Sequence, residues 1–186
     1  MRAGVDAVDH AQARIANPAF QFTHTAAHTA WYAAVNALFG TFRRFRADFS
    51  VIPWATFTEP EVAHVGMYEQ DAKDKGIEVE TYTFKLDEVD RAILDGEDEG
   101  FARVHIQKGS DTILGATIVA AHAGEMIGEF SVLMKAGVGA KAIAGTIHPY
   151  PTQAEVNKKV VNLWRKAHFT QATRNRLMKL FAWMRR

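Results

Sequence analysis

The segment from His148 to Glu155 holds the side chains of this sequence best suited to chemistry. It runs His-Pro-Tyr-Pro-Thr-Gln-Ala-Glu and combines the titratable side chains of His148, Tyr150 and Glu155 with two prolines. Because proline restricts the backbone of the residue before it, His148 and Tyr150 are expected to lie outside a helix. A rigid turn of this kind can present His148, Tyr150 and Glu155 to a reacting group.

The same segment also suits a purely structural role. Thr152 is a good N-cap residue, and Glu155 follows three residues later, which is the spacing of a capping box. This spacing predicts a helix from Thr152 to His168 and gives Glu155 a role without chemistry. The spacing alone leaves both interpretations open.

Composition indicates a soluble and cytoplasmic globular protein. The chain has 186 residues, of which 48% are apolar and 23% are charged, and it has no cysteine. This length fits one domain, or one domain plus a fragment. Without cysteine, disulfides, thiolate metal sites and cysteine redox chemistry in this chain are excluded. No apolar run approaches about 18 residues, so no membrane-spanning helix is expected, and residues 1–17 lack the pattern of a secretory signal.

Charge is distributed unevenly along the chain. Residues 59–99 contain 14 acidic and 4 basic residues, whereas residues 156–186 contain 9 basic residues and no acidic one. Such a split can indicate a nucleic-acid or membrane partner. We favour two faces that attract each other, within one subunit or across a dimer, because the acidic part has the sequence of a regular domain.

Hydrophobic periodicity predicts an α+β fold, in which an antiparallel sheet has helices packed on one side. Residues 1–17 are expected to form a loose arm or a poorly fixed helix, which ends at a break at Asn17-Pro18. Strands are predicted over residues 51–57, 79–86, 101–106 and 112–121. Helices are predicted over residues 23–39, 58–67, 70–75, 87–94, 124–136, 152–168 and 171–184, with a connecting segment over residues 138–147.

Two further groups of residues near the N-terminus are weak candidates for binding. His24 and His28 lie one helical turn apart, as metal ligands can, but no third ligand is nearby, and we expect no metal site. Arg43, Arg44 and Arg46 alternate with phenylalanines in a segment that could contact phosphate. A solvated connection is the favoured interpretation of that segment.

Three separated motifs occur in an order that identifies a family. They are residues 53–66, residues 115–127 and residues 150–155. In this order they resemble the opening strand region, the central strand with its interface helix, and the His-Pro-Thr-x-x-Glu signature of one domain. That domain is the C-terminal dimerisation domain of the pyridine nucleotide-disulfide oxidoreductases, the family of glutathione reductase, dihydrolipoamide dehydrogenase and mercuric reductase. The resemblance covers about residues 50–167 and implies a homodimer.

Upstream, residues 20–26 are similar to the last part of the family's FAD domain, where a helix N-terminus faces the flavin. The resemblance implies that Phe22, Thr23 and His24 lie at the flavin edge, where free N–H groups and the helix dipole stabilise negative charge. It divides the chain into three parts. Residues 1–49 are an arm and a remnant of the FAD domain's last helix, residues 50–167 are the dimerisation domain, and residues 168–186 are a basic amphipathic helical extension.

Other parts of the family pattern are not found in this sequence. The Gly-rich FAD fingerprint, the NAD(P) domain and the redox cysteine pair are missing. The chain is therefore expected to be the tail end of such an enzyme and to be inactive alone. FAD and NAD(P) are expected in the full-length enzyme, with neither bound by this chain alone. The remaining FAD and NAD(P) domains are expected partners.

The signature departs from the family pattern at one position. Tyr150 stands where the disulfide reductases have a histidine base. Mercuric reductases are similar in having a tyrosine at this position. His148, two residues earlier, is a possible substitute for the histidine base. The resemblance implies that Tyr150 and Glu155 act at the partner subunit's active site. A tyrosine, with a pKa of about 10, is a poor base at neutral pH but a good hydrogen-bond donor.

Two alternatives remain beside the dimerisation module. In the first, the chain is itself an enzyme with His148, Tyr150 and Glu155 as a complete site, although no nucleophile, metal set or cofactor cradle accompanies them. In the second, the chain binds a membrane, a nucleic acid or another partner through the basic helix over residues 171–186. For that helix, packing against the acidic segment or the FAD domain is the favoured interpretation, and no nucleic-acid partner is expected.

Overall fold

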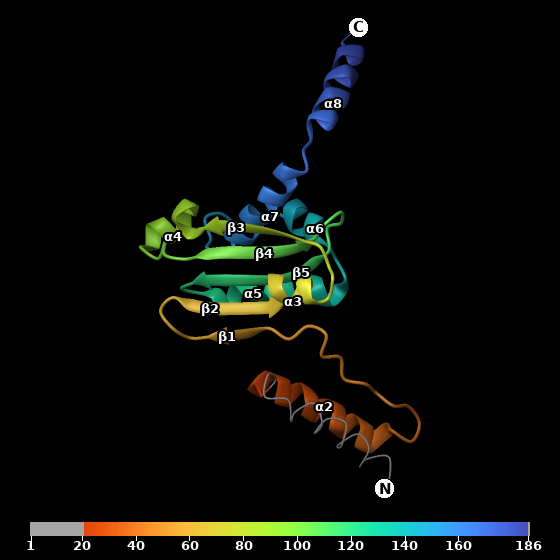
Figure 1. Ribbon diagram of the computed structural model, residues 1–186. Helices are drawn as coiled ribbons and strands as arrows, with labels where there is room; N and C mark the ends of the chain where they lie inside the picture. The colour runs from red at the N-terminus through yellow and green to blue at the C-terminus, as the bar shows by residue number, and fades with distance from the viewer. Residues whose placement is uncertain (1–20, 186) are drawn as a thin grey trace. The chain divides into compact units, whose positions relative to one another are not determined.

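The computed structural model describes residues 21–185, and Figure 1 shows their helices and strands. The chain divides into two compact units, Met1–Ile52 and Pro53–Arg186. The predicted arm over residues 1–17 and the break at Asn17-Pro18 lie outside the described residues.

The described part of the first unit is built around helix α2 (Thr23–Phe39), which has the predicted bounds. Phe22 occupies the N-cap position of α2 and supplies no side-chain hydrogen bond. After the helix, the Asn36 amide donates to the Phe45 carbonyl and accepts from the Phe45 N–H, each over 2.8 Å. This pair of bonds fixes the segment that follows α2.

The described part of the second unit contains an antiparallel sheet with the strand order β1-β2-β5-β4-β3. The strands are β1 (Trp54–Thr56), β2 (Glu61–Gly66), β3 (Val79–Lys85), β4 (Phe101–Gln107) and β5 (Ile113–Ala120). The central strand β5 is apolar and largely buried, as its sequence predicts for a strand covered by other elements.

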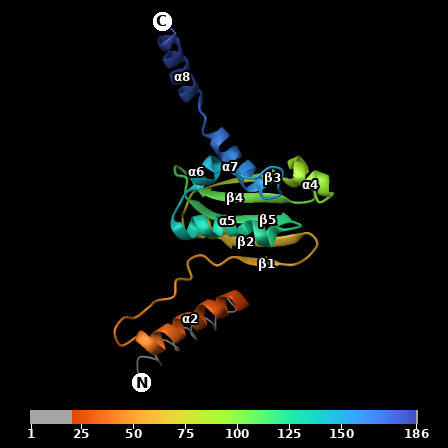
Figure 2. The ribbon, with the colours of Figure 1, turned by 180° about the vertical axis from the view of Figure 1, so that it is seen from behind.

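Helices α5 (Ala123–Ala136) and α7 (Glu155–Ala167) cover one face of this sheet, which confirms the predicted α+β fold. The first packs on β5 and β2, and the second packs on β3 and β4. Figure 2 shows both helices in front of the strands. The other elements are α3 (Glu69–Asp74), the 3₁₀ turn η2 (Leu86–Glu88), α4 (Asp90–Asp95), α6 (Ala140–Gly145) and α8 (Gln171–Met184).

The core lies between these two helices and the sheet. Alternate strand residues face the helices, and those that are fully buried include Ala63, Val65, Val104, Ala116 and Ile118. On the helix side, Phe130 and Val160 are also fully buried. Removing one such large side chain from water contributes about 1.5–3 kcal/mol. The contact between helices and sheet therefore holds the second unit together.

The predicted helix over residues 58–67 is wrong, because residues 61–66 form strand β2. A threonine, a proline and two acids resemble a helix start, but β2 pairs with β1 on one side and β5 on the other. Both pairings satisfy its backbone and bury Ala63 and Val65. Glu61 does act at a helix start, but that of α5, where its carboxylate accepts from the Gly124 N–H over 2.9 Å.

The predicted connection over residues 138–147 contains the short helix α6. Its residues Ala140, Ile143 and Ala144 are buried, and α6 packs against α7. Six residues are too few for a periodic signal in the sequence. The helix forms because tertiary packing covers its apolar side.

The sheet face opposite α5 and α7 is polar and carries a buried histidine on β2. His64 is 2% exposed, and its Nδ1 lies 2.9 Å from the Thr117 hydroxyl. Its Nε2 lies 3.1 Å from the Gly66 carbonyl oxygen, and the Tyr68 ring stacks on the imidazole at 3.9 Å. The neutral ring satisfies both contacts, with Nε2 donating to the carbonyl and Nδ1 accepting from the hydroxyl.

A second buried histidine, His105, lies on β4 of the same face and is 3% exposed. Its Nδ1 lies 2.9 Å from the Thr81 hydroxyl, which in turn donates to Glu69 over 3.3 Å. Burial lowers the pKa of His105, and the charges of His64 and Arg103 lower it further. Burial also lowers the pKa of His64, against the opposing effects of the Gly66 hydrogen bond and the Asp71 charge.

Two glycines form a matched pair for testing the packing of this unit. A Cβ on Gly115 would overlap the backbone carbonyl oxygen of Met67, whereas a Cβ on Gly128 would meet nothing within 4 Å. Gly115→Ala is expected to lower the free energy of unfolding by about 1–3 kcal/mol. Gly128→Ala, inside α5, is expected to raise it by about 0.5–1 kcal/mol. Urea unfolding measures both, and a Gly115→Ala variant as stable as the parent would contradict this packing.

The two buried histidines predict that stability falls when the pH drops below about 6.5. Their folded-state pKa is lowered, so the unfolded chain binds more protons in this range and stability rises with pH across it. The double variant His64→Gln, His105→Gln should lose this slope between about pH 5.5 and 7. Denaturant midpoints measured across the range provide the test. The control is His122→Gln, whose side chain is 64% exposed, and an unchanged slope in the double variant would refute the assignment.

Candidate functional site

The segment between α6 and α7 carries the residues predicted to do chemistry. The Thr152 hydroxyl donates to the Pro149 carbonyl over 2.9 Å, and α7 begins only at Glu155. Ala154 occupies the N-cap position without a side-chain hydrogen bond. The predicted capping box of Thr152 and Glu155, and the predicted helix start at Thr152, are therefore wrong. The hydroxyl closes the preceding turn and does not cap the helix.

Tyr150 is exposed and tied to an acid of α4. Its side chain is 69% exposed, and its hydroxyl donates to the Asp90 carboxylate over 2.5 Å. The hydrogen bond to Asp90 raises the pKa of Tyr150, and the charges of Asp90 and Glu155 act in the same direction. At neutral pH, Tyr150 is therefore protonated and serves as a hydrogen-bond donor.

His148 belongs to a different network from Tyr150. Its side chain is 8% exposed, and its Nε2 lies 3.0 Å from Oε1 of Glu129 on α5. Its Nδ1 lies 3.3 Å from the Thr146 carbonyl oxygen. The partners of both ring nitrogens are oxygen acceptors. His148 thus fixes the turn to α5.

Asn157 on α7 extends this network. It is fully buried, and its amide donates to Oε2 of Glu129 over 2.9 Å and to the Met126 carbonyl over 3.0 Å. Glu129 therefore joins α5, the turn and α7. Sequence reasoning missed both residues, although each is a polar residue on the buried side of an amphipathic helix. Glu129 follows Met126 by three residues, and Asn157 precedes Val160 by three.

Glu155 is the first residue of α7, where an acid interacts favourably with the helix dipole. Its Oε2 is buried and has no hydrogen-bond partner among the described residues. Next to it, Gln153 is 7% exposed and donates to Glu97 over 2.6 Å. His148, Tyr150 and Glu155 are close in sequence, but the hydrogen bonds described above join His148 and Tyr150 to Glu129 and Asp90 and not to one another.

The three residues predicted to lie at the flavin edge belong to the first unit. Phe22 is extended and precedes α2, and Thr23 and His24 form the first turn of that helix. The Phe22 ring stacks on the His24 ring at 5.2 Å. No acidic residue lies in the first turn of α2. The positive end of the helix dipole is therefore not compensated by a side chain there.

The structure gives no support to metal or membrane-spanning sites in the part that it describes. Among residues 21–185, no group of three or more His, Asp or Glu side chains could hold a metal ion. In the same range, no helix is both long and apolar enough to cross a bilayer. His28 contacts the rings of Tyr32 and Phe49 at 4.9 and 5.8 Å.

A family model for the pyridine nucleotide-disulphide oxidoreductase dimerisation domain matches residues 52–161. The chain belongs to this family. It is 37% identical to a mercuric reductase of Bacillus cereus over 144 residues, which cover 77% of this chain and 22% of that protein. It is 38% identical to a dihydrolipoyl dehydrogenase of Geobacillus stearothermophilus over 109 residues, or 59% of this chain and 23% of that protein.

Solved structures show the same fold. The HOCl-induced flavoprotein disulfide reductase RclA from Escherichia coli superposes with a TM-score of 0.71 at 22% identity, covering 76% of this chain and 32% of that one. The chain thus spans less than a third of the length of these relatives. The family predicted from the three motifs is confirmed, and its domain provides the frame for the residues described above.

The network around Glu129 predicts strong coupling between His148 and Glu129. His148→Gln and Glu129→Gln are each expected to lower the free energy of unfolding by about 1–3 kcal/mol. The double variant should lose less than the sum, with a coupling energy of about 1–2 kcal/mol, because the second change finds the contact already broken. Chemical unfolding of the four proteins measures the cycle.

The control for this cycle is the exposed ion pair of Arg91 and Asp95, in which Nε of Arg91 lies 2.7 Å from Oδ2 of Asp95. Arg91→Gln and Asp95→Asn should couple more weakly, because water screens an exposed ion pair. Additive effects of the His148 and Glu129 substitutions would show that this contact does not fix the turn.

Proposed function

We propose that this chain pairs two subunits of a flavoprotein reductase and contributes Tyr150 and Glu155 to the active site of the partner subunit. The observation that carries the proposal is the exposure of the turn before α7. Ile147 is 92% exposed and Tyr150 is 69% exposed, while His148 between them is held by Glu129. A fixed turn that presents an apolar and an aromatic side chain is suited to contact with a second subunit.

Further exposed apolar side chains of the second unit support pairing. Val132 on α5 is 68% exposed, and Val138, just after α5, is 42% exposed. Obligate dimers bury about 2,000 Å² or more in largely apolar interfaces. Covering Val132, Val138 and Ile147 in a homodimer would remove these side chains from water.

The chemistry proposed for Tyr150 is hydrogen bonding as a neutral phenol, whose one O–H is donated to Asp90 and whose oxygen can accept a further bond at the shared site. Asp90 accepts from its hydroxyl and raises its pKa, so that Tyr150 stays neutral and does not act as a general base. His148 does not replace the family's histidine base in this proposal, because Glu129 and the Thr146 carbonyl occupy both of its ring nitrogens. The separate partners of His148 and Tyr150 favour a contribution to a shared site over a complete site within this chain.

FAD and NAD(P) are proposed as cofactors of the full-length enzyme. Phe22, Thr23 and His24 fit the flavin edge, since the start of α2 has neither a side-chain cap nor an acid in its first turn. The positive end of its dipole suits the negative charge of a reduced flavin. When bound, the flavin supplies hydride transfer with the nicotinamide cofactor. No cofactor binding is proposed for this chain alone.

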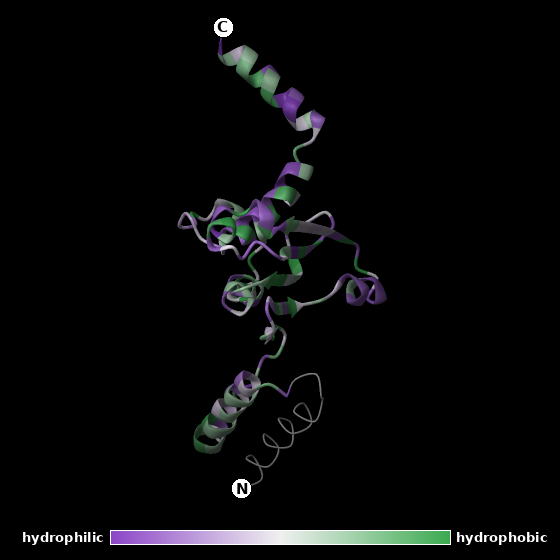
Figure 3. Cartoon of the chain, turned by 90° about the vertical axis from the view of Figure 1, so that its left-hand side faces the viewer, coloured by the Kyte–Doolittle hydropathy of each residue, from purple (hydrophilic) through white to green (hydrophobic). Residues whose placement is uncertain are grey.

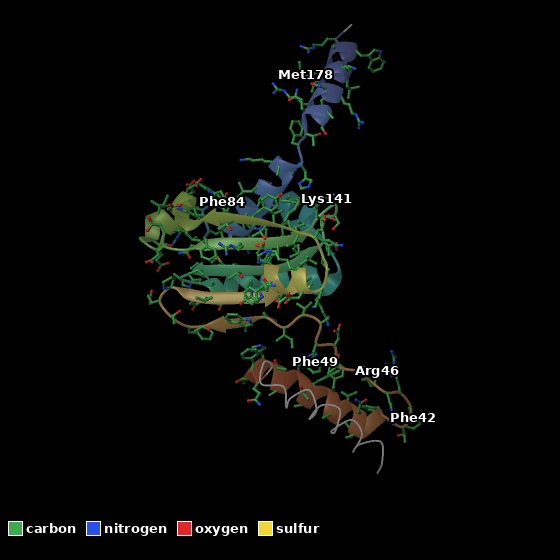
Figure 4. All side chains as sticks on the ribbon, in the orientation of Figure 1. Phe42, Arg46, Phe49, Phe84, Lys141 and Met178 are labelled. Carbon is green, nitrogen blue, oxygen red and sulfur yellow. The ribbon has the colours of Figure 1, made fainter. Side chains whose placement is uncertain are left out.

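The mass of the chain in solution tests the proposal. At micromolar concentration, light scattering should give twice the monomer mass of 20.7 kDa. Ile147→Asp should weaken the dimer by about tenfold or more, because a buried interface position cannot hold an unpaired charge. The control is Phe42→Asp, an equally exposed position (91%) in the first unit (Figure 4). A monomeric parent chain, or equal effects of the two substitutions, would refute the proposed interface.

A further inference from the structure

Helix α8 is a separate candidate surface, because it has no buried residue. Its large apolar side chains are exposed by 47% at Leu180, 48% at Phe181, 71% at Trp183 and 66% at Met184. Figure 3 shows both hydrophilic and hydrophobic residues along the helix. The helix has its own cap, since the Thr170 hydroxyl accepts from the Thr173 N–H over 3.2 Å.

Four of the large apolar residues of α8 lie on one side. Leu177, Leu180, Phe181 and Met184 follow the spacing i, i+3, i+4 and i+7, which places them in one stripe. Arg174 and Arg176 lie along the two edges of this stripe, and Lys179 lies on the remaining surface. The helix therefore combines an apolar stripe with positive charge around it.

The charge of this region selects the kind of partner. Residues 156–186 contain 9 basic residues and no acidic one. A second copy of α8 is a poor partner, because pairing along the stripe would bring like charges together. An anionic surface is complementary to every charged side chain on the helix.

The length of α8 determines how the helix can bind an anionic lipid surface. A helix of 14 residues is about 21 Å long, which is shorter than the roughly 30 Å of a hydrocarbon core. A basic helix with Leu and Phe on one side is instead suited to lie in the plane of the bilayer interface. Trp183 has the amphipathic ring that prefers this depth.

We propose that α8 binds an anionic lipid surface, with its axis in the plane of the bilayer. Leu177, Leu180, Phe181 and Met184 enter the interfacial region, while Arg174, Arg176 and Lys179 contact lipid phosphates. This inference uses α8 alone and does not depend on the proposed role in subunit pairing.

Co-sedimentation of the full chain with vesicles tests this inference. Binding is expected to phosphatidylcholine vesicles that contain about 30% phosphatidylglycerol, to weaken at high salt, and to be much weaker with phosphatidylcholine alone. The triple variant Arg174→Gln, Arg176→Gln, Lys179→Gln should bind on the order of 100-fold more weakly. The variant Leu180→Ser, Phe181→Ser should also lose binding, because the apolar contact is removed.

The matched control is the triple variant Lys85→Gln, Lys108→Gln, Lys141→Gln, which removes the same charge from other exposed positions (Lys141 is labelled in Figure 4). It should bind vesicles like the parent chain. Since α8 contains no buried residue, its variants should keep the circular dichroism and the solution mass of the parent. This separates a failure of lipid binding from a failure of subunit pairing.

Several results would overturn the inference. If the chain bound neutral and anionic vesicles equally, the positive charge of α8 would have no role in binding. The same conclusion would follow if the control variant lost as much vesicle binding as the α8 triple variant. Absence of binding to anionic vesicles would exclude the lipid surface. If replacing Leu180 and Phe181 lowered the mass of the chain in lipid-free solution, the partner of α8 would be a second copy of the chain. If the chain bound RNA through α8 but did not bind vesicles, the partner of α8 would be a nucleic acid.

Discussion

The carboxylate of Glu129 joins three segments on which the candidate site depends. One oxygen pairs with His148 of the turn, and the other accepts from Asn157 of α7, while Glu129 itself belongs to α5. A half-buried acid is costly unless it is paired and hydrogen-bonded, and here both oxygens have partners. The position of the turn, and therefore of Tyr150, follows from how α5 and α7 pack on the sheet.

The sheet separates two kinds of interior. On the side of α5 and α7, small and branched residues such as Ala63, Val65 and Ile118 are fully buried. On the other side, His64 and His105 are buried among hydroxyl and carbonyl groups. The apolar side contributes to stability because it removes apolar surface from water. On the polar side, burial lowers the pKa of both histidines.

In the proposed function, Tyr150 takes the place of the family's histidine, and this changes what the segment can do. A neutral phenol held by Asp90 donates a hydrogen bond over the whole physiological pH range, whereas a histidine would exchange a proton there. The same turn still exposes Ile147, so its geometry suits subunit contact whichever residue occupies position 150. Pairing and chemistry are thus separable properties of this domain. Helix α8 adds a further surface, on which every charged side chain is basic.

The sequence by itself determined the long periodic elements and the family. Helices α2, α5 and α8 and strands β3, β4 and β5 follow from patterns of many residues, and the three ordered motifs of residues 53–155 were sufficient to recognise the domain. Tyr150 could also be singled out, because its place in the signature is local.

Only the tertiary structure decided what the polar residues contact. Residues 61–66 form a strand because β1 and β5 lie on either side, although their acids and proline resemble a helix start. His148 pairs with Glu129, 19 residues away, and not with the nearby Glu155. Thr152 closes a turn and does not cap α7. Each of these contacts depends on which elements pack together, because a hydrogen bond requires atoms within about 3 Å of each other. Spacing along the chain does not set that distance.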